Sequence, residues 1–184
     1  ALRYAIEQGC HVVTMSMGGL PSKAWAEAVN RAYEAGITIV SAAGNNIRKL
    51  GVNSPQSLVY PARFDRVIAA CGVMADGSAY IRENAGSEMA GNYGPDRKMR
   101  TALAAYTPNV FWPEFGCPQI VSMDGQGTSA ATPQIAAAAA LWLMRHNPSV
   151  DQKWKRVEAV RHALFTSAQK VDPEHFGNGI LQAR

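Results

Sequence analysis

The sequence predicts an α/β protein in which helices cover both faces of a mainly parallel sheet. Two short apolar runs rich in β-branched residues, 11–15 and 37–43, have the composition of buried parallel strands. A helical segment separates them, so they form a βαβ unit with a right-handed crossover. The 184 residues, 47% of them hydrophobic, can build one core but not two ordinary domains. We therefore expect residues 1–184 to form a single three-layer αβα sandwich.

The chain opens with a helix and a strand. Leu2, Ala5 and Ile6 fall on one face of a short helix, Gly9 ends it, and the strand 11–15 follows. The first residue is not methionine, and the helical pattern begins at once. We therefore expect this chain to be part of a longer protein.

A second helix and strand complete the βαβ unit. Ser22 is a typical N-cap for a helix through Ala35, and Gly36 stands just past its end. The inward side of this helix is expected to carry Ala24, Ala28, Val29 and Ala32. The strand 37–43 follows, and the turn-forming residues 44–46 end it.

The middle of the chain has fewer regular patterns. We expect a loop over 47–66, a strand over 67–74, and mainly loops over 75–118 with short strands at 103–106 and 110–112. The apolar run Ile120–Met123 predicts one more strand, which glycines end.

The last third of the chain is helical. A helix opens at Thr128–Ser129, and its first turn accommodates Pro133. Every residue from Ile135 to Met144 is apolar, so we expect this helix to be buried all round. An amphipathic helix at about 150–168 follows, with Trp154, Val157, Val160 and Leu164 on its apolar side, and residues 176–181 form a turn and a closing segment.

Composition excludes several classes of function. The net charge is +4 and the pI is near 9.1, but the basic residues are dispersed, and the densest group, Lys153–Arg161, also contains Glu158. We interpret that group as a solvated helix face, so no nucleic-acid partner is expected. No apolar run is long enough for a membrane span, and no signal-peptide layout is present.

Three cysteines, Cys10, Cys71 and Cys117, lie in or beside apolar stretches without the spacing of a metal site. We expect them to be buried free thiols and leave one disulfide open. No metal-ligand set is predicted.

Ser129 is the residue that suggests chemistry. At a helix N-terminus, backbone N–H groups and the helix dipole favour developing negative charge near the Ser129 hydroxyl. The pattern therefore fits a nucleophile, although a capped core helix would explain it equally well.

Three blocks stand in a fixed order along the chain: Val12–Gly19, Val40–Asn45 and Gly127–Pro133. Together with Tyr60-Pro61 and Gly177–Gly179, they resemble the C-terminal part of the catalytic domain of the subtilisin-like serine proteases, the subtilases. The resemblance covers nearly the whole chain. It implies a subtilisin-like fold that is incomplete at its N-terminal side.

The resemblance implies roles for individual residues in peptide-bond hydrolysis. Ser129 matches the nucleophile that forms the acyl-enzyme, and the Asn45 amide matches the side chain that forms the oxyanion hole with a backbone N–H at Ser129. The substrate-binding residues would be Ser16, Met17 and Gly18 in an extended segment, with Ala42, Ala43 and Gly44 in the opposite wall of the primary specificity pocket. Val59 stands where members with deep pockets carry glycine, which implies a preference for small P1 residues.

The subtilases order their catalytic triad Asp, His, Ser, so the first two members are expected before residue 1. His11, His146, His162 and His175 all lack the family's His-Gly-Thr setting, and we expect this chain to be inactive alone. The resemblance also implies upstream strands beside Val12–Met15. Without them, an open sheet edge is expected to self-associate or to bind the missing N-terminal part.

Two departures from the family are Ala130, beside the nucleophile in place of the commoner methionine, and Gln134, where histidine is usual. Calcium commonly supports the family's fold, but the resemblance places no ligands, and no other cofactor is implied. Secretion is the family expectation.

Two alternatives remain. Residues 125–130 formally fit the dinucleotide- or phosphate-binding pattern G-x-G-x-x-A, although no acidic strand end follows about 20 residues later. A catalytically silent pseudo-protease or binding module would have the same motifs if the upstream Asp or His were absent. An α/β-hydrolase is excluded because Ala131 stands where its nucleophile motif needs glycine.

Overall fold

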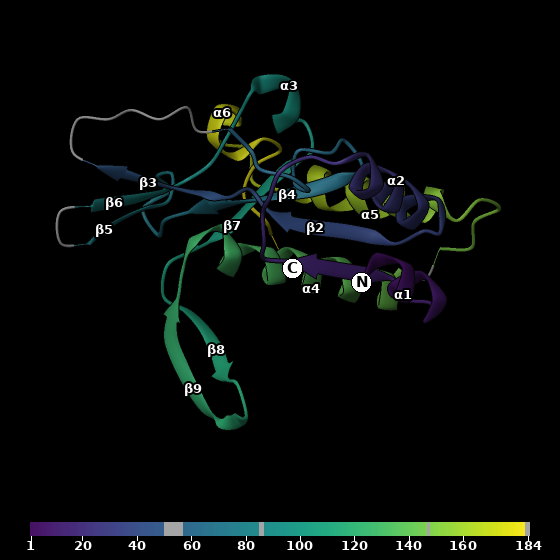
Figure 1. Cartoon of the computed structure of the whole chain (residues 1–184), viewed down its shortest axis with the longest axis horizontal. Coiled ribbons are helices and arrows are strands. Elements are labelled where there is room, and N and C mark those ends of the chain that lie inside the picture. The colour runs from purple at the N-terminus through teal and green to yellow at the C-terminus, as the bar shows by residue number, and fades with distance from the viewer. Residues whose placement is uncertain (50–56, 85–86, 147, 183–184) are drawn as a thin grey trace.

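A four-stranded parallel sheet forms the centre of the molecule. The computed structural model describes residues 1–49, 57–84, 87–146 and 148–182. The sheet has the order β1-β2-β4-β7, with β1 at Val12–Met15, β2 at Thr38–Ala42, β4 at Val67–Val73 and β7 at Ala102–Tyr106. Neighbouring strands pair in parallel throughout. The predicted parallel sheet is confirmed, and β1 is one of its two edge strands (Figure 1).

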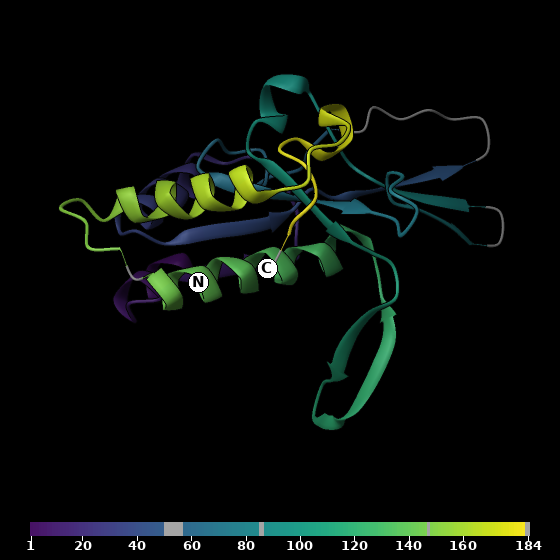
Figure 2. The same ribbon diagram turned by 180° about the vertical axis from the view of Figure 1, so that it is seen from behind.

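Helices cover both faces of this sheet, as predicted. α4 (Gly127–His146) and α5 (Trp154–Ser167) lie side by side on one face (Figure 2), where Ile135 packs with Val40 and Leu103. α1 (Leu2–Glu7) and α2 (Lys23–Glu34) cover the other face, where Val29 packs with Ile39. Val40 and Ile39 are neighbours in β2 and enter different layers because successive strand side chains point to opposite faces.

The signals predicted at the ends of α2 are confirmed. The Ser22 hydroxyl accepts a hydrogen bond from the Trp25 N–H at 3.1 Å, and Gly36 has a φ of 81°. Val29 and Ala32 are buried, but the prediction that Ala24 faces inward is wrong. Ala24 lies in the first turn, before the residues of α2 that pack into the core.

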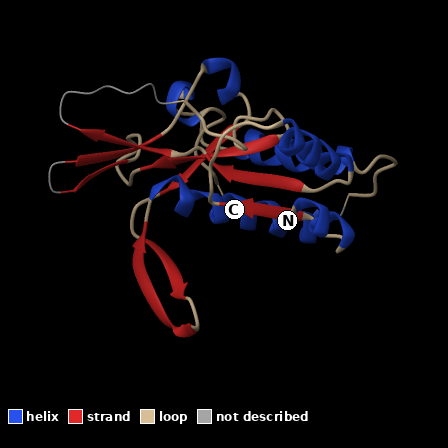
Figure 3. Cartoon of the chain, in the orientation of Figure 1, coloured by secondary structure: helices blue, strands red, loops and turns tan. Residues whose placement is uncertain are grey.

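A second, three-stranded antiparallel sheet was not predicted. It has the order β3-β6-β5, with β3 at Asn45–Lys49, β6 at Ser87–Gly91 and β5 at Ile81–Asn84 (Figure 3). The predicted turn at 44–46 and loop over 47–66 are therefore wrong for 45–49, whereas 50–56 lie outside the described residues. This sheet depends on pairing between distant segments, since Asn45 lies opposite Gly91.

A long β-hairpin projects from the body of the molecule (Figure 1). It consists of β8 (Val110–Glu114) and β9 (Cys117–Gly125), which confirms strands near both predicted positions. β9 leads into α4, yet it pairs antiparallel with β8, outside the parallel sheet. The dinucleotide-binding alternative needs a strand of a parallel sheet before the glycines, so it is wrong.

The prediction that α4 is buried all round is also wrong. Ile135 and Ala139 are fully buried against the sheet, but Leu141 is 57% and Met144 is 77% exposed. The apolar composition of the helix permits burial on every side, but β1, β2, β4 and β7 lie on one side only. The structure therefore leaves an apolar helix face uncovered.

The C-terminal segment closes the core. Val157, Val160 and Leu164 of α5 are buried as predicted. Two short helices, α3 (Asp96–Met99) and α6 (Pro173–Phe176), were not predicted. Ile180 then bridges Ala104 and Gln169, which confirms the closing segment.

The three cysteines are free, and only Cys71 is buried. The prediction of buried thiols is wrong for Cys10, which lies in the turn between α1 and β1, and for Cys117 on the projecting hairpin. In the part of the chain that the structure describes, no helix is long and apolar enough to cross a membrane.

Candidate active site

The predicted site residues meet at the carboxyl ends of β1 and β2. Ser16 follows β1 directly, Asn45 follows β2 after two residues, and Ser129 is the third residue of α4. Loops at the carboxyl ends of parallel strands lie at the same edge of a sheet, which brings these distant segments together. The Ser16 hydroxyl donates a hydrogen bond to the Ser129 backbone carbonyl at 2.8 Å.

Pro133 explains why that carbonyl is free. In an α-helix the Ser129 carbonyl would accept from the N–H of residue 133, but proline has none. Pro133 lies inside α4 and beyond its first turn, so its predicted place in the first turn is wrong. The Ser16 hydroxyl supplies the missing donor and ties the segment after β1 to the N-terminus of α4.

Thr128 ties α4 to the end of β2. Its backbone N–H donates to Asn45 Oδ1 at 3.0 Å, and its hydroxyl accepts from the Gly44 N–H at 3.1 Å. The same hydroxyl lies 3.2 Å from the Gly44 carbonyl and 3.3 Å from Asn45 Oδ1. Because Thr128 is fully buried, these contacts are shielded from water and fix the Asn45 amide.

The amide of Asn45 rests against Gly127. A Cβ at Gly127 would lie 2.8 Å from Asn45 Nδ2, and the Gly127 φ of 73° also favours glycine. With Oδ1 occupied by Thr128, the two Nδ2 hydrogens are the remaining donors of the amide. Within the described residues they have no hydrogen-bond partner.

Val59 closes the space between the two predicted walls of the pocket. A Cβ at Gly18 would lie 2.5 Å from Val59 Cγ2, and one at Gly44 would lie 2.8 Å from Val59 Cγ1. The Val59 N–H bonds the Ala43 carbonyl at 3.0 Å, and the Gly19 N–H bonds the Tyr60 carbonyl at 2.9 Å. The structure thus places Val59 between the Ser16–Gly18 and Ala42–Gly44 segments.

The other predicted substrate-binding residues differ in how far their side chains are exposed. Ala42 and Ala43 are buried, so only their backbone groups can contact a ligand. The Met17 side chain is 55% exposed. Ser41, which was not singled out, is fully buried and donates to the Met15 carbonyl at 3.1 Å, and this contact holds the segment after β1.

Sequence reasoning did not single out Arg82, Tyr80 or Thr128, which lie at or near the start of α4. Arg82 Nη1 donates to Gln126 Oε1, beside the start of α4. Tyr80 is 1% exposed, and burial raises the pKa of its phenol, with Arg82 and the Gly127 N–H acting in the opposite direction. Tyr80 and Arg82 lie in a stretch without periodicity, whereas Thr128 could have been found beside Ser129.

No histidine contacts Ser129. His11 precedes β1 and so lies at the amino end of the sheet, whereas His146 ends α4, about 25 Å from Ser129 along the helix axis. His162 is exposed on α5, and the ring of His175 packs 4.2 Å from the ring of Tyr93. Ser129 therefore has no general base among the described residues.

One group in the described chain could offer three metal ligands, namely Asp172, Glu174 and His175. Their contacts are explained by helix capping, because Asp172 accepts from the Glu174 N–H at 2.9 Å and pairs with His175 Nδ1 at 2.5 Å.

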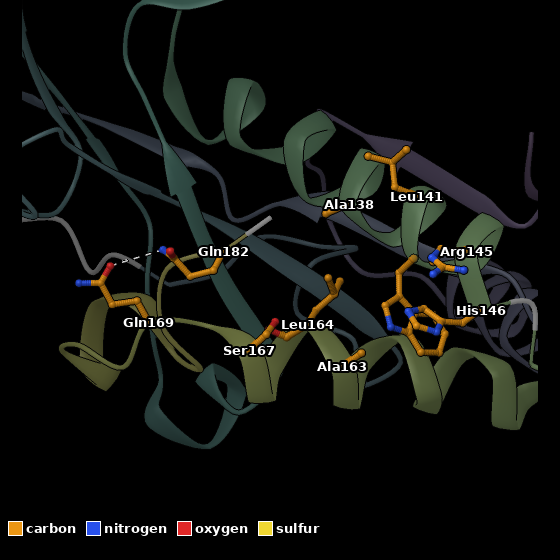
Figure 4. Close-up of a pocket in the computed structure, with 10 residues that line it drawn as sticks. Ala138, Leu141, Arg145, His146, Ala163, Leu164, Ser167, Gln169 and Gln182 are labelled. Atoms are coloured by element: carbon orange, nitrogen blue, oxygen red, sulfur yellow. Dashed lines mark hydrogen bonds between the residues drawn. The ribbon is translucent and has the colours of Figure 1, made fainter. Parts of the chain in front are cut away.

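An apolar groove between α4 and α5, lined by residues such as Leu141, Trp142 and Leu164 (Figure 4), holds none of the predicted site residues.

Sequence comparison identifies the fold family. The model of the subtilase family matches residues 1–179. The chain belongs to the subtilase family. It is 32% identical to a thermostable alkaline protease of Halalkalibacterium halodurans over 99% of the chain and 43% of that protein. It is 30% identical to subtilisin DY of Bacillus licheniformis over 98% of the chain and 58% of that protein. The chain thus spans about half the length of these subtilases.

Solved structures show the same fold. The prenylagaramide maturation protease PagA matches with a TM-score of 0.74 and 21% identity, over 99% of the chain and 62% of the PagA chain. The PatG macrocyclase domain matches with a TM-score of 0.75 and 21% identity, over 98% of the chain and 52% of the PatG chain. The subtilisin-like αβα fold predicted from the sequence is therefore confirmed.

Proposed function

We propose that the complete protein is a serine endopeptidase of the subtilisin type, with Ser129 as nucleophile. In the proposed reaction the Ser129 Oγ attacks the scissile carbonyl, an acyl-enzyme forms as the amine leaves, and water releases the second product. The negative charge on the carbonyl oxygen in each tetrahedral intermediate needs fixed hydrogen-bond donors. We assign these donors to the Asn45 amide and to a backbone N–H at the start of α4.

The Thr128–Asn45 contact carries this proposal. An asparagine amide can turn either its oxygen or its nitrogen toward a ligand, and only the nitrogen stabilises an oxyanion. The 3.0 Å bond from the Thr128 N–H occupies Oδ1, so Nδ2 remains the available group. The buried Thr128 hydroxyl holds the same strand end, which limits the reorganisation that catalysis requires.

The general base must come from elsewhere, because none of the four histidines contacts Ser129. We propose that the triad Asp and His precede residue 1 in the complete protein, as the order in subtilases implies. The chain alone would then retain an oxyanion hole and a binding groove but only a weakly nucleophilic serine. It would hydrolyse peptides at no useful rate.

The proposed partner of the chain is the upstream part of the same catalytic domain. β1 pairs only with β2 among the described strands, so one of its edges is open. Beside it, α4 exposes Leu141 and Met144. An α/β segment that adds a strand to β1 and a helix to α4 would cover both features, and the chain's partial coverage of its relatives leaves room for such a segment.

Peptides with a small P1 residue are the proposed substrates. Gly18 and Gly44 line the two walls of the proposed pocket. Because glycine has no side chain, these walls would leave space for a large P1 side chain if residue 59 were also small. Val59 fills that space, because its two methyl groups lie against the two glycines.

The test is to assay the complete protein and its Ser129→Ala variant with a chromogenic peptide amide and an active-site serine reagent. Hydrolysis and labelling that both disappear in Ser129→Ala would support the proposal. A complete protein that binds peptides but neither cleaves them nor reacts with the reagent would instead be a pseudo-protease.

A further inference from the structure

A pocket next to the proposed substrate groove is unusually basic. It is a depression of about 430 Å³ between the loop after Val59 and helix α3, and we call it the basic pocket. It is lined by Tyr60, Arg63, Asp65, Arg97, Lys98 and Arg100. Four basic side chains and one carboxylate give these residues a net charge of +3.

The single carboxylate engages two of the four cations. Asp65 accepts from Lys98 Nζ at 2.6 Å and pairs with Arg100 Nη2 at 3.2 Å. The hydrogen bond from Lys98 is the main reason that the pKa of Asp65 lies below its ordinary range. Arg63 and Arg97 pair with no carboxylate among the described residues. Two guanidinium groups therefore remain to bind an anion.

The arrangement suits carboxylates on a flexible ligand. Each guanidinium presents a planar fork that matches two oxygens, and the Arg63 guanidinium lies 5.9 Å from the centre of the Tyr60 ring, which restrains its orientation. Asp96 does not line the basic pocket. It lines a separate depression with Met99 and Pro173. Repulsion among the four cations would be relieved by a bound acidic group.

Tyr60 connects the basic pocket to the path of the substrate. Its side chain lines the pocket, while its backbone carbonyl accepts from the Gly19 N–H at 2.9 Å. Gly19 directly follows the Ser16–Gly18 segment that is proposed to pair with the peptide backbone. Gly19 lies three residues from Ser16, which is about 10 Å at 3.3 Å per extended residue. A peptide held there would pass close to the basic pocket.

We propose that the basic pocket binds acidic side chains of the peptide substrate a few residues from the scissile bond. This inference rests on the proposed function and adds a charge preference at a distance from the P1 pocket. It makes acidic peptides, and not neutral ones, the preferred ligands.

Binding can be measured without catalysis in the complete protein carrying Ser129→Ala. Two fluorescent peptides share a small P1 residue and differ only in a flanking run of glutamates or glutamines, placed on either side of the scissile bond. Anisotropy should show tighter binding of the glutamate peptide. Arg63→Gln with Arg97→Gln should weaken that binding about tenfold, as expected for two charged contacts near the surface, and should leave the glutamine peptide unchanged.

Two further variants test the position of the effect. Arg31→Gln removes an exposed arginine on α2 and should change neither affinity. Asp65→Asn raises the charge of the basic pocket and should tighten binding of the glutamate peptide. Equal affinity for both peptides, or equal weakening by Arg31→Gln, would overturn the inference.

The two proposals can fail separately. If the wild-type protein cleaves neither peptide but the glutamate preference depends on Arg63 and Arg97, the pocket assignment holds and the peptidase assignment fails. If both peptides are cleaved and bound equally, the peptidase assignment holds and the pocket assignment is wrong.

Discussion

The Ser16 hydroxyl donates a 2.8 Å hydrogen bond to the backbone carbonyl of Ser129, the carbonyl that Pro133 leaves without a helical donor. A residue at the end of β1 therefore completes the hydrogen bonding of α4 at the proposed nucleophile. The contact links the proposed substrate-binding segment to the proposed nucleophile, so a shift of one should move the other.

Ser16→Ala should lower kcat/KM several-fold and destabilise the complete protein by about 1 kcal/mol, the usual contribution of one hydrogen bond. Pro133→Ala restores an N–H at the position from which helices bond that carbonyl. In the Pro133→Ala background, the stability loss caused by Ser16→Ala should therefore shrink. A double-mutant cycle by denaturant unfolding measures this coupling, and strictly additive losses would contradict it.

Asn45→Ala should lower kcat far more than it raises KM, because the lost donor acts on charge that exists mainly in the transition state. The expected loss is about 10²- to 10³-fold, the size known for removing the corresponding asparagine in a subtilisin. Asn45→Asp is the control, since it keeps the oxygen that accepts from the Thr128 N–H but loses the Nδ2 donor. It should fold normally and lose at least as much turnover. A loss confined to KM in either variant would disprove the role.

Val59→Gly should open the pocket between Gly18 and Gly44 to large P1 side chains. We expect wild-type protein to prefer Ala over Phe at P1, and Val59→Gly to improve kcat/KM for Phe by about 10-fold or more, the usual scale for hydrophobic pocket changes. Val59→Ala should give an intermediate value. Efficient wild-type cleavage after Phe, unchanged in Val59→Gly, would be evidence against a blocking role.

The helices and strands that were predicted correctly are those whose own residues carry a strand or helix signal. The β-branched run before Gly44 and the Ser22 cap each specify an element without reference to distant residues. By contrast, β3 and β6 are polar and short, and they become strands only because Asn45–Lys49 and Ser87–Gly91 meet across the fold. Propensity within a window cannot anticipate such pairing.

The proposed site shows the same division. Ser129 was singled out by its place at a helix N-terminus, whereas the role of Asn45 was implied only by the resemblance to the subtilases, and both roles stay predictions. Arg82 and Tyr80 were missed because they reach the start of α4 only through tertiary structure, Arg82 from the unpredicted strand β5 and Tyr80 from the residue before it. The apolar α4 face was misjudged for a related reason, since composition shows what a helix can bury but not which neighbours it has.

Cys71 should respond differently from the other two cysteines. Burial raises the pKa of its thiol from 9.0 to about 12, whereas Cys10 and Cys117 are exposed. A thiol reagent at pH 8 should therefore titrate two cysteines in the folded protein and the third only after unfolding. A group with a raised folded pKa stabilises the fold fully below its unfolded value, so this contribution should disappear between pH 9 and 12. Cys71→Ala should flatten the alkaline loss of stability, while Cys10→Ala should not.

The isolated 184-residue chain should self-associate and be inactive. The open edge of β1 can accept another strand, and the exposed Leu141 and Met144 on α4 add apolar area beside it. Light scattering should therefore report a mass above that of the 19.8 kDa monomer. Leu141→Glu with Met144→Glu should reduce this association, and Leu20→Glu, at an 87% exposed residue in the loop between β1 and α2, is the matched control.

Adding a fragment with the expected Asp and His in trans should convert the oligomer into a complex that cleaves peptides. In that complex the two α4 substitutions should weaken assembly, because a charged carboxylate would be buried without a partner. The active-site serine reagent separates assembly from chemistry, since Ser129 should react only when a histidine base is supplied. A fully active monomer of the isolated chain would sink both parts of this prediction and would require one of the four histidines to reach Ser129.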